Sequence, residues 1–305
     1  MTPSRPSRIL AFLLFWFIRP LLVLVARGPR VVPPVRRFIN RLSVAPERGT
    51  VVTDGPGGEW VRGPGVAEGG DQAILYLHGS GYVVCSPGTH RGLVAQLSKR
   101  AGMPAFSVDY RLAPEHPFPA AFDDMVAAYR YLLDEGYAGK NIVVAGDSAG
   151  GHLAISLVAA LTEAELPVPA GLILFSPLVD PSFETAAKIE REARDPAFTA
   201  KVAKRFLKLY TDGGTPDDAR LAVISGDSAL MPPVLLHAGS REMLRADADA
   251  LAEWLAHENI HCDYTVWEGQ IHVFQMFYAW LPEARAALRE AGDFARSCVS
   301  ARTVA

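Results

Sequence analysis

Short apolar runs alternate with longer helical patterns along most of the chain. Runs rich in β-branched and aliphatic residues predict strands at Val51–Thr53, Glu59–Arg62, Ala73–His78, Ala105–Tyr110, Ile142–Gly146, Leu172–Phe175, Val234–Ala238 and Asp263–Trp267. Apolar positions at helical spacing predict helices at Thr89–Arg100, Phe118–Leu133, Gly150–Leu161, Ala246–His257 and Pro282–Phe294. Such alternation is typical of a mostly parallel sheet with helices on both faces, so we predict an α/β fold with roughly eight strands.

The segment Ser182–Asp212 interrupts this alternation. It separates two predicted strands by far more than an ordinary connection and has a charged helical pattern of its own. Long insertions of this kind in compact domains are usually lids. We therefore predict a helical cap above the carboxyl ends of the strands, built from residues 1–45 and an inserted segment at about 181–213 of the core, which spans 46–305. The alternative for the insertion is a surface excursion without contact to substrate.

The N-terminal segment Ile9–Ala26 is almost wholly apolar and is flanked by arginines. Arg19-Pro20 divides it into runs shorter than the ~20 residues of a spanning helix, and an arginine at mid-bilayer costs about 3 kcal/mol. No cleavage site typical of a signal peptide follows the segment. We predict two short helices over an apolar pocket, or an interfacial helix that touches lipid through residues 9–26, and these two readings are compatible.

The most specific motif is Gly146-Asp147-Ser148-Ala149-Gly150, which follows a predicted strand and opens a predicted helix. A G-x-S-x-G sequence in this context forms a sharp turn that lifts the serine hydroxyl clear of the sheet. Glycines at both ends of the turn let the strand and the helix approach closely. Ser148 is therefore the candidate nucleophile, and Asp147 supports the motif.

A serine hydroxyl is a poor nucleophile at neutral pH, so it needs a base and a carboxylate that orients the base. In this architecture the acid and then the histidine follow the serine along the chain. Of the eight histidines, His272 alone lies past the last predicted strand, in a glycine-marked loop. We predict His272 as the base.

Two carboxylates compete for the third role. Glu242 lies in the loop after the strand predicted at Val234–Ala238, whereas Asp247 falls where the next helix begins. A carboxylate at that place is also favoured by the helix dipole alone. We predict Glu242 as the acid, and the choice between Glu242 and Asp247 remains open.

A small-residue turn, His78-Gly79-Ser80-Gly81, follows the strand predicted at Ala73–His78. Backbone N–H groups in such a turn can point toward a developing oxyanion, and Ala149 after the nucleophile offers another. A glycine turn is common by itself, but next to the Ser148 motif it becomes much more specific.

Four motifs together resemble the hormone-sensitive-lipase-like branch of the α/β-hydrolases, which includes bacterial esterases, acetyl-hydrolases and lactone hydrolases. They are His78-Gly79-Ser80-Gly81, Asp109-Tyr110-Arg111-Leu112-Ala113-Pro114-Glu115, Gly146-Asp147-Ser148-Ala149-Gly150-Gly151 and Ile271-His272-Val273-Phe274. The resemblance implies an α/β-hydrolase fold with a helical cap, Ser148 and His272 as nucleophile and base, and oxyanion donors at the amides of Ser80, Gly81 and Ala149.

The chain departs from the family pattern at three places. Ser80 stands where the family has the second glycine of its turn, Cys85 stands where glycine is common, and Glu242 stands where aspartate is more frequent. We expect Asp109, Arg111 and Glu115 of the second motif to form a buried ion-pair network that holds the site.

Composition excludes several other classes of protein. A net charge of -3 provides no broad basic field, so we expect no nucleic acid partner. Three widely spaced cysteines have no metal-ligand pattern and fit a reducing compartment, which favours a cytoplasmic protein with no disulfide, metal or cofactor.

The sequence therefore predicts a serine carboxylesterase that hydrolyses small esters through an acyl-enzyme. The resemblance implies a preference for short acyl chains, with cap residues shaping an apolar pocket, for which we expect Phe12, Phe15, Trp16 and Phe17. Lactone or amide hydrolysis on the same residues, a membrane-associated lipase and a non-catalytic ligand receptor are the alternatives. A peripheral membrane contact and a homodimer remain open as partners.

Overall fold

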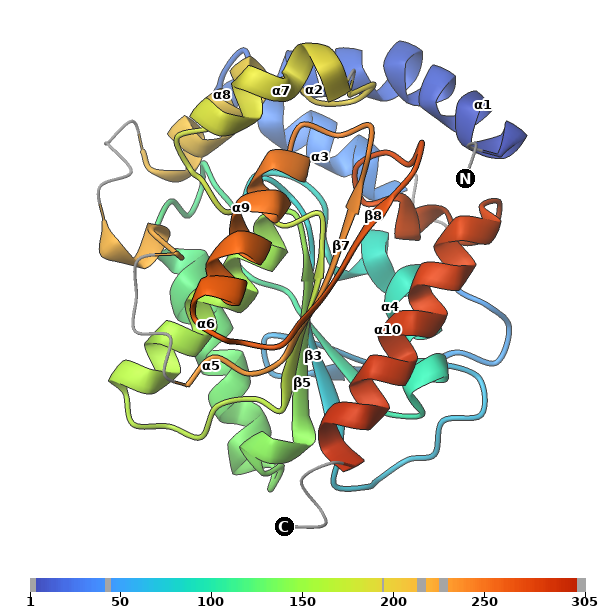
Figure 1. Ribbon diagram of the computed structural model, residues 1–305, viewed down its shortest axis with the longest axis vertical. Coiled ribbons are helices and arrows are strands. Elements are labelled where there is room, and N and C mark those ends of the chain that lie inside the picture. Colours follow the sequence, from blue (N-terminus) through green and yellow to red (C-terminus); the bar gives the residue numbers. More distant parts are fainter. Residues whose placement is uncertain (1–3, 42–44, 194, 213–217, 225–229, 301–305) are drawn as a thin grey trace.

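Eight strands form one sheet in the computed structural model, which describes residues 4–41, 45–193, 195–212, 218–224 and 230–300 (Figure 1). The strands are β1 (Val51–Gly55), β2 (Gly58–Arg62), β3 (Ala73–Leu77), β4 (Ala105–Val108), β5 (Ile142–Asp147), β6 (Gly171–Phe175), β7 (Val234–Gly239) and β8 (Cys262–Trp267). Their order is β1-β2-β4-β3-β5-β6-β7-β8, parallel from β4 to β8, while β1 and β2 pair antiparallel at one edge. The prediction of a mostly parallel sheet of roughly eight strands is confirmed.

Helices cover both faces of the sheet, and each face has its own apolar core. Figure 1 shows α4 (Pro87–Ala101) and α10 (Pro282–Ser300) on one side, and α5 (Ala120–Asp134), α6 (Ala149–Glu163) and α9 (Arg245–His257) on the other. The central strands β3, β5 and β6 are buried along their whole length, because apolar side chains point to both faces. Polar groups of these strands can therefore reach a ligand only beyond the strand ends.

A layer of helices lies over one end of the sheet. Figure 1 shows α1 (Arg5–Leu13), α2 (Arg19–Val25), α3 (Val32–Arg41), α7 (Glu184–Ala193) and α8 (Ala200–Tyr210) there. Helix α2 contacts α3 and α8, so the N-terminal segment and the insertion meet. Of the residues predicted to form the cap, 1–3, 42–44, 194 and 213 lie outside the described part of the chain.

Short helical turns complete the described structure. They are η1 (Leu14–Ile18), η2 (Pro29–Val31), η3 (Gly139–Asn141), η4 (Ala219–Leu221) and η5 (Phe274–Phe277).

The prediction that Arg19-Pro20 divides the N-terminal segment is wrong, because the chain is helical without a break from Arg5 to Val25. Proline lacks the N–H of an ordinary helical bond. The preceding turn η1 is π-helical, and the Arg19 N–H reaches back five residues to the Leu14 carbonyl. This wider turn accommodates the proline without ending the helix. By length and composition alone, the helix could cross a membrane.

Candidate active site

Ser148 stands at the sharp turn between β5 and α6. Its backbone angles, φ 54° and ψ -121°, are rare for a residue with a side chain, and its N–H donates to the Phe175 carbonyl at 3.0 Å. A Cβ on Gly146 would collide with the Gly150 carbonyl, and one on Gly150 would collide with the Leu77 carbonyl. The two glycines of the motif are therefore required by the close approach of strand and helix.

The loop after β8 brings His272 to this serine. Nε2 of His272 lies 3.0 Å from Oγ of Ser148, and Nδ1 lies 2.6 Å from Oε2 of Glu242. The next residue, Val273, has φ 47° and ψ 45°, an unfavourable conformation for a β-branched side chain. Strain of this kind is tolerated where the surroundings fix the backbone, here at the turn that presents the imidazole.

Glu242 is fully buried in the loop after β7 and is held from several sides. Its Oε1 accepts hydrogen bonds from the Gly239 N–H at 2.6 Å and from the Ser176 hydroxyl at 2.9 Å. The Ser176 oxygen in turn accepts the Val273 N–H at 3.1 Å. Ser176 thus joins the carboxylate loop to the histidine loop. No motif in the sequence singles out Ser176, although a polar residue directly after the buried strand β6 is a signal.

Asp247, the competing carboxylate, has a different set of partners. Its Oδ2 accepts the N–H groups of Val179 and Asp180 at 2.8 and 2.9 Å. Its Oδ1 is buried with no hydrogen-bond partner among the described residues. Burial raises the pKa of Asp247 to about 7, against the lowering effect of the two N–H groups. The structure therefore places Glu242, and not Asp247, beside His272.

His272 is held in a field of carboxylates. Burial lowers its pKa, but the hydrogen bond and charge of Glu242, together with the charges of Asp195 and Asp147, outweigh burial and raise the pKa above its usual value. Negative charge on these groups thus stabilises the imidazolium that forms when the ring accepts a proton.

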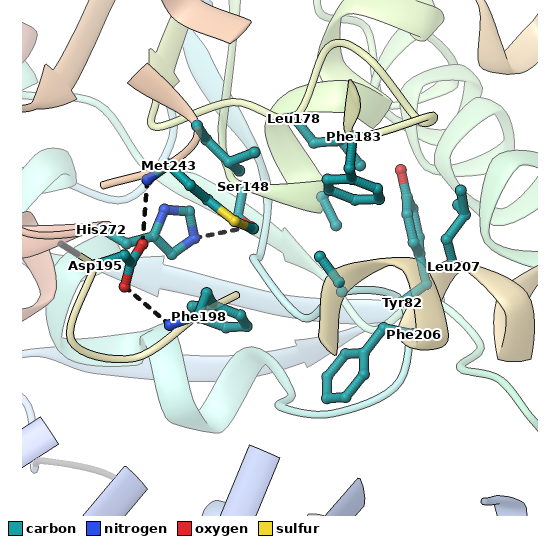
Figure 2. Close-up of a pocket in the computed structure, with 14 residues that line it drawn as sticks. Tyr82, Ser148, Leu178, Phe183, Asp195, Phe198, Phe206, Leu207, Met243 and His272 are labelled. Carbon is teal, nitrogen blue, oxygen red and sulfur yellow. Dashed lines mark hydrogen bonds between the residues drawn. The ribbon is translucent and has the colours of Figure 1, made fainter. Parts of the chain in front are cut away.

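Asp195 belongs to the insertion but lines the same site, as Figure 2 shows. Its Oδ1 accepts the N–H groups of Ala197 and Phe198, both at 2.8 Å, and its Oδ2 accepts the Met243 N–H at 3.3 Å. Burial raises its pKa. Met243 directly follows Glu242, so this carboxylate connects the insertion to the acid loop. No motif in the sequence singles out Asp195, although aspartate before Pro196 is a turn signal.

Asp147 holds the turn after β3. Its Oδ1 accepts the Gly79 N–H at 2.9 Å and the Tyr76 hydroxyl at 2.7 Å, while Nε2 of His90 lies 3.3 Å from Oδ2. His78 is buried beside them, and burial lowers its pKa to about 3, so its ring is neutral. The motif residues His78, Gly79 and Asp147 thus have structural roles, because their contacts hold the turn after β3 in place.

The amides of Ser80 and Gly81 are candidates for binding an oxyanion. Within the described part of the chain, neither N–H has a hydrogen-bond acceptor, and both residues line a cavity that also contains Ser148. Gly81 has φ 53°, and a Cβ there would lie 2.6 Å from the ring of Phe206. The Ser80 hydroxyl lies 2.6 Å from that of Tyr110 and accepts the Tyr82 N–H, so serine is accommodated in place of the family glycine.

Two cavities meet at Ser148. The smaller, of about 40 Å³, is lined mainly by apolar side chains of the core loops and the insertion, which Figure 2 labels: Tyr82, Leu178, Phe183, Phe198, Phe206, Leu207 and Met243. The larger, of about 270 Å³, is lined by Leu14, Ile18 and Leu22 of the N-terminal helix and by the segment around Tyr278. Phe198 lines both cavities.

The prediction that Phe12, Phe15, Trp16 and Phe17 shape this pocket is wrong, because all four side chains are exposed. The helix presents a different side to the cavity, the one that carries Leu14, Ile18 and Leu22.

The expected buried network of the second motif is also wrong. Arg111 pairs with Asp124 and Glu115 pairs with Arg36, in both cases near the surface. The latter pair connects α3 to the core, and Arg36 also donates to the Val83 carbonyl at 2.8 Å.

The cysteines and metal-ligating side chains form no further centre in the part of the chain that the structure describes. Cys85 and Cys262 are free thiols. Cys85 has φ 69°, which fits the family preference for glycine at this position, and burial raises the pKa of its thiol to about 12. Among the described residues there is no group of three or more potential metal ligands.

Comparison with known proteins gives the family. The alpha/beta hydrolase fold family matches residues 74–276. The chain belongs to the hormone-sensitive-lipase-like branch of the α/β-hydrolases. An acetyl-hydrolase of Streptomyces hygroscopicus is 38% identical over 259 residues, 85% of either chain. An esterase of Acinetobacter venetianus is 35% identical over 74% of this chain and 75% of its own.

Solved structures agree with this assignment. The esterase EstE5 superposes with a TM-score of 0.90 at 31% identity and covers 97% of this chain and 99% of its own. An esterase of the bacterial hormone-sensitive lipase family gives a TM-score of 0.87 at 32% identity and covers 98% of this chain and all of its own. This α/β-hydrolase is therefore a carboxylic ester hydrolase.

Proposed function

We propose that the enzyme hydrolyses esters through an acyl-enzyme on Ser148. The observation that carries this proposal is the unbroken chain of hydrogen-bonding atoms from Ser148 through His272 to Glu242. His272 takes the hydroxyl proton as Ser148 attacks the ester carbonyl, and then gives it to the leaving alcohol. Water, deprotonated by the same ring, releases the acid and restores the serine.

The amides of Ser80, Gly81 and Ala149 are proposed to bind the negative charge that develops on the carbonyl oxygen. Support comes from the Ser80 and Gly81 N–H groups, which have no acceptor among the described residues, and from the position of Ala149 at the start of α6. Donors already aimed at the oxyanion need no reorganisation during the reaction, and each contributes about 3 kcal/mol in a known hydrolase.

We propose a preference for short acyl chains, with the acyl group in the 40 Å³ cavity. A cavity of this size between Phe183, Phe206 and Leu207 has little room beyond a few carbon atoms. The larger apolar cavity of 270 Å³ then receives the alcohol part of the ester. Residues 1–45 and 181–213 form the cap in this proposal, since both segments supply side chains to these cavities.

Rates with p-nitrophenyl acetate, butyrate, octanoate and palmitate test both parts. We expect kcat/KM to be highest for the short esters, and a steady rise toward palmitate would contradict the acyl assignment.

Ser148→Ala should lower kcat by about 10⁵-fold or more with every ester, as in other serine hydrolases. An active Ser148→Ala variant would overturn the proposed nucleophile. A fluorophosphonate probe should label the wild type but not this variant, which tests Ser148 as the nucleophile without turnover.

We also propose a cytoplasmic location. Unpaired thiols are typical of a reducing compartment, and Cys85 and Cys262 of this enzyme are free thiols.

A further inference from the structure

Six of the seven large apolar side chains exposed on the N-terminal helix lie in its first thirteen residues. They are Ile9, Phe12, Leu13, Phe15, Trp16 and Phe17, here called the outer face. Most recur at spacings of three and four residues, so they share one side of the helix. The opposite side is buried against the enzyme through Leu10, Ala11, Leu22 and Val25. A contiguous exposed patch of this kind marks an interaction surface.

The charge around the outer face is of one sign. Residues 1–46 contain eight arginines and neither lysine nor carboxylate, whereas the rest of the chain has 22 basic and 33 acidic residues, a net charge of -11. Six of these arginines are exposed: Arg5, Arg8, Arg27, Arg30, Arg37 and Arg41. Among the described residues, only Arg36 of the eight forms an ion pair. The apolar surface therefore has a basic border against an otherwise acidic molecule.

The neighbouring helix α8 extends this basic border. Its exposed side carries Lys201, Lys204, Arg205 and Lys208. Arg205 and Lys208 line a surface groove together with Arg27 at the end of α2, and Asp212 is the one carboxylate among the described residues that line it. Figure 1 shows α8 beside α2 in the helical layer.

We propose that the outer face docks on an anionic lipid bilayer, with the helix lying in the plane of the surface. Aromatic and aliphatic side chains enter the boundary between headgroups and acyl chains, while the arginines meet lipid phosphates. A helix with one apolar side, a basic border and its other side fixed to a globular domain fits this mode of binding.

Two other occupants are less well matched. A spanning helix would have to detach from the enzyme, where Ser7 donates to the Gly269 carbonyl at 3.2 Å and Leu10 and Ala11 belong to an apolar cluster with Ile271 and Phe274. A second copy of the chain would bring two arginine-rich borders together, which costs repulsion.

Docking in this way also determines which esters reach the site, and this step rests on the proposed function. Leu14, Ile18 and Leu22, on the inner side of the same helix, line the 270 Å³ cavity that contains Ser148 and His272. The bilayer and the cavity thus contact opposite sides of one helix. Esters dissolved in the membrane are the substrate class that this arrangement favours.

Flotation of the full-length enzyme with vesicles measures the docking directly. We expect binding to vesicles of phosphatidylglycerol mixed with phosphatidylcholine, weak binding to phosphatidylcholine alone, and loss of binding at high salt. Trp16→Ser should weaken binding about tenfold or more, because a large apolar side chain no longer leaves water. Arg8→Gln should weaken it about fivefold, since one arginine near an anionic surface contributes on that scale.

The chain supplies a matched control for each variant. Val51 is 45% exposed on edge strand β1, at the end of the sheet opposite the cap, so Val51→Ser should bind vesicles like the wild type. Arg130 is an exposed arginine on α5. Arg130→Gln is therefore the control for Arg8→Gln and should also bind vesicles like the wild type. All four variants should hydrolyse soluble p-nitrophenyl acetate at the wild-type rate, which shows that they fold.

Three outcomes would overturn the docking proposal, and a fourth would separate it from the proposed function. Equal binding to both vesicle types would remove the anionic partner. Binding that survives a high-salt wash and sodium carbonate extraction would indicate a spanning helix. Absence of vesicle binding, together with a dimer that Trp16→Ser dissociates, would assign the outer face to a second copy. An enzyme without esterase activity that still binds anionic vesicles would refute the proposed function alone.

Discussion

The loops around the catalytic site and the helical cap differ in how their side chains are held, as Glu242 and Phe12 illustrate. Glu242 has no exposed surface and contacts the imidazole, a backbone N–H and a serine hydroxyl. Phe12, on the helix above the site, is exposed, with Trp16 as its ring neighbour. A buried hydrogen bond requires a particular distance and angle between its atoms, whereas the attraction between apolar side chains is non-directional.

The difference separates two tasks. The loops at the carboxyl end of the sheet fix the reacting atoms, so small changes there should alter the rate with every substrate. The cap is held largely by apolar contacts, so changes there should alter which ester reaches Ser148 or where the enzyme binds. Asp195 takes part in both regions, because it belongs to the insertion but accepts a hydrogen bond from the Met243 N–H of the acid loop.

Among the residues that hold the imidazole, the largest effect is expected from Glu242→Gln. The amide cannot balance the charge of a protonated His272 and favours the wrong tautomer, so kcat should fall by about 10³- to 10⁴-fold, as for the equivalent change in a known protease. Steady-state kinetics with p-nitrophenyl butyrate measures this loss.

Asp247→Asn is the matched comparison, since both carboxylates are buried and lie in the same segment. The new amide oxygen can accept both N–H groups that Oδ2 accepts now, so activity should change little. With a pKa of about 7, Asp247 keeps its proton in the folded state between about pH 4 and 7, where the unfolded chain loses it. The wild type should therefore lose stability as pH rises through this range, and the variant should lose less. If Asp247→Asn abolished activity while Glu242→Gln retained it, the roles would be exchanged.

Ser176→Ala should have the next largest effect. It removes the hydroxyl that donates to Glu242 and leaves the Val273 N–H buried without an acceptor. A hydrogen bond to a charged group contributes about 1.5–3 kcal/mol, which sets an upper limit of about 100-fold on the loss of kcat/KM.

Ser107 provides the control for this variant. It is equally buried in β4, but its hydroxyl has no partner among the described residues, so Ser107→Ala should leave both rate and stability nearly unchanged. Equal effects of the two substitutions would mean that the Ser176 hydroxyl has no special role. Thermal unfolding of both variants should be recorded beside the kinetics.

The sheet could be predicted because its signal is local. Strand β6 is an apolar run, β5 is one up to Gly146-Asp147, and the periodicity of α6 and α9 is visible in the sequence. The course of the N-terminal helix could not be predicted in the same way. A rule about proline favoured a break at Pro20, but a π-helical turn just before it removed the conflict.

The positions around the site divide similarly. Ser148 and His272 stand in sequence contexts that specify a turn and a loop, so they were named from the sequence. Ser176 and Asp195 carry no motif, and their partners are far away in the chain, at Glu242, Val273 and Met243. The choice of Glu242 over Asp247 beside His272 likewise needed three-dimensional distances. Contacts over long sequence separations are what a single sequence does not reveal.

The smallest predicted effect concerns Asp195→Asn, the residue that links the two regions. Its negative charge raises the pKa of His272, so the amide should lower that pKa. Because His272 must be neutral to accept the serine proton, the rate falls as pH decreases through its pKa. The acid limb of the kcat/KM profile should therefore move to lower pH in the variant.

The plateau of the same profile reports on geometry. The asparagine keeps one oxygen, so either the Met243 N–H or those of Ala197 and Phe198 lose their acceptor, and the acid loop is less firmly held. We expect the plateau to fall by about tenfold at most, equivalent to about 1.4 kcal/mol. Asp54→Asn, an exposed carboxylate on edge strand β1, should change neither limb nor plateau. A lower plateau with an unmoved limb would mean that Asp195 only supports the loop. A shifted limb means that a cap residue sets the proton affinity of the base, so the cap would then take part in the chemistry as well as in access.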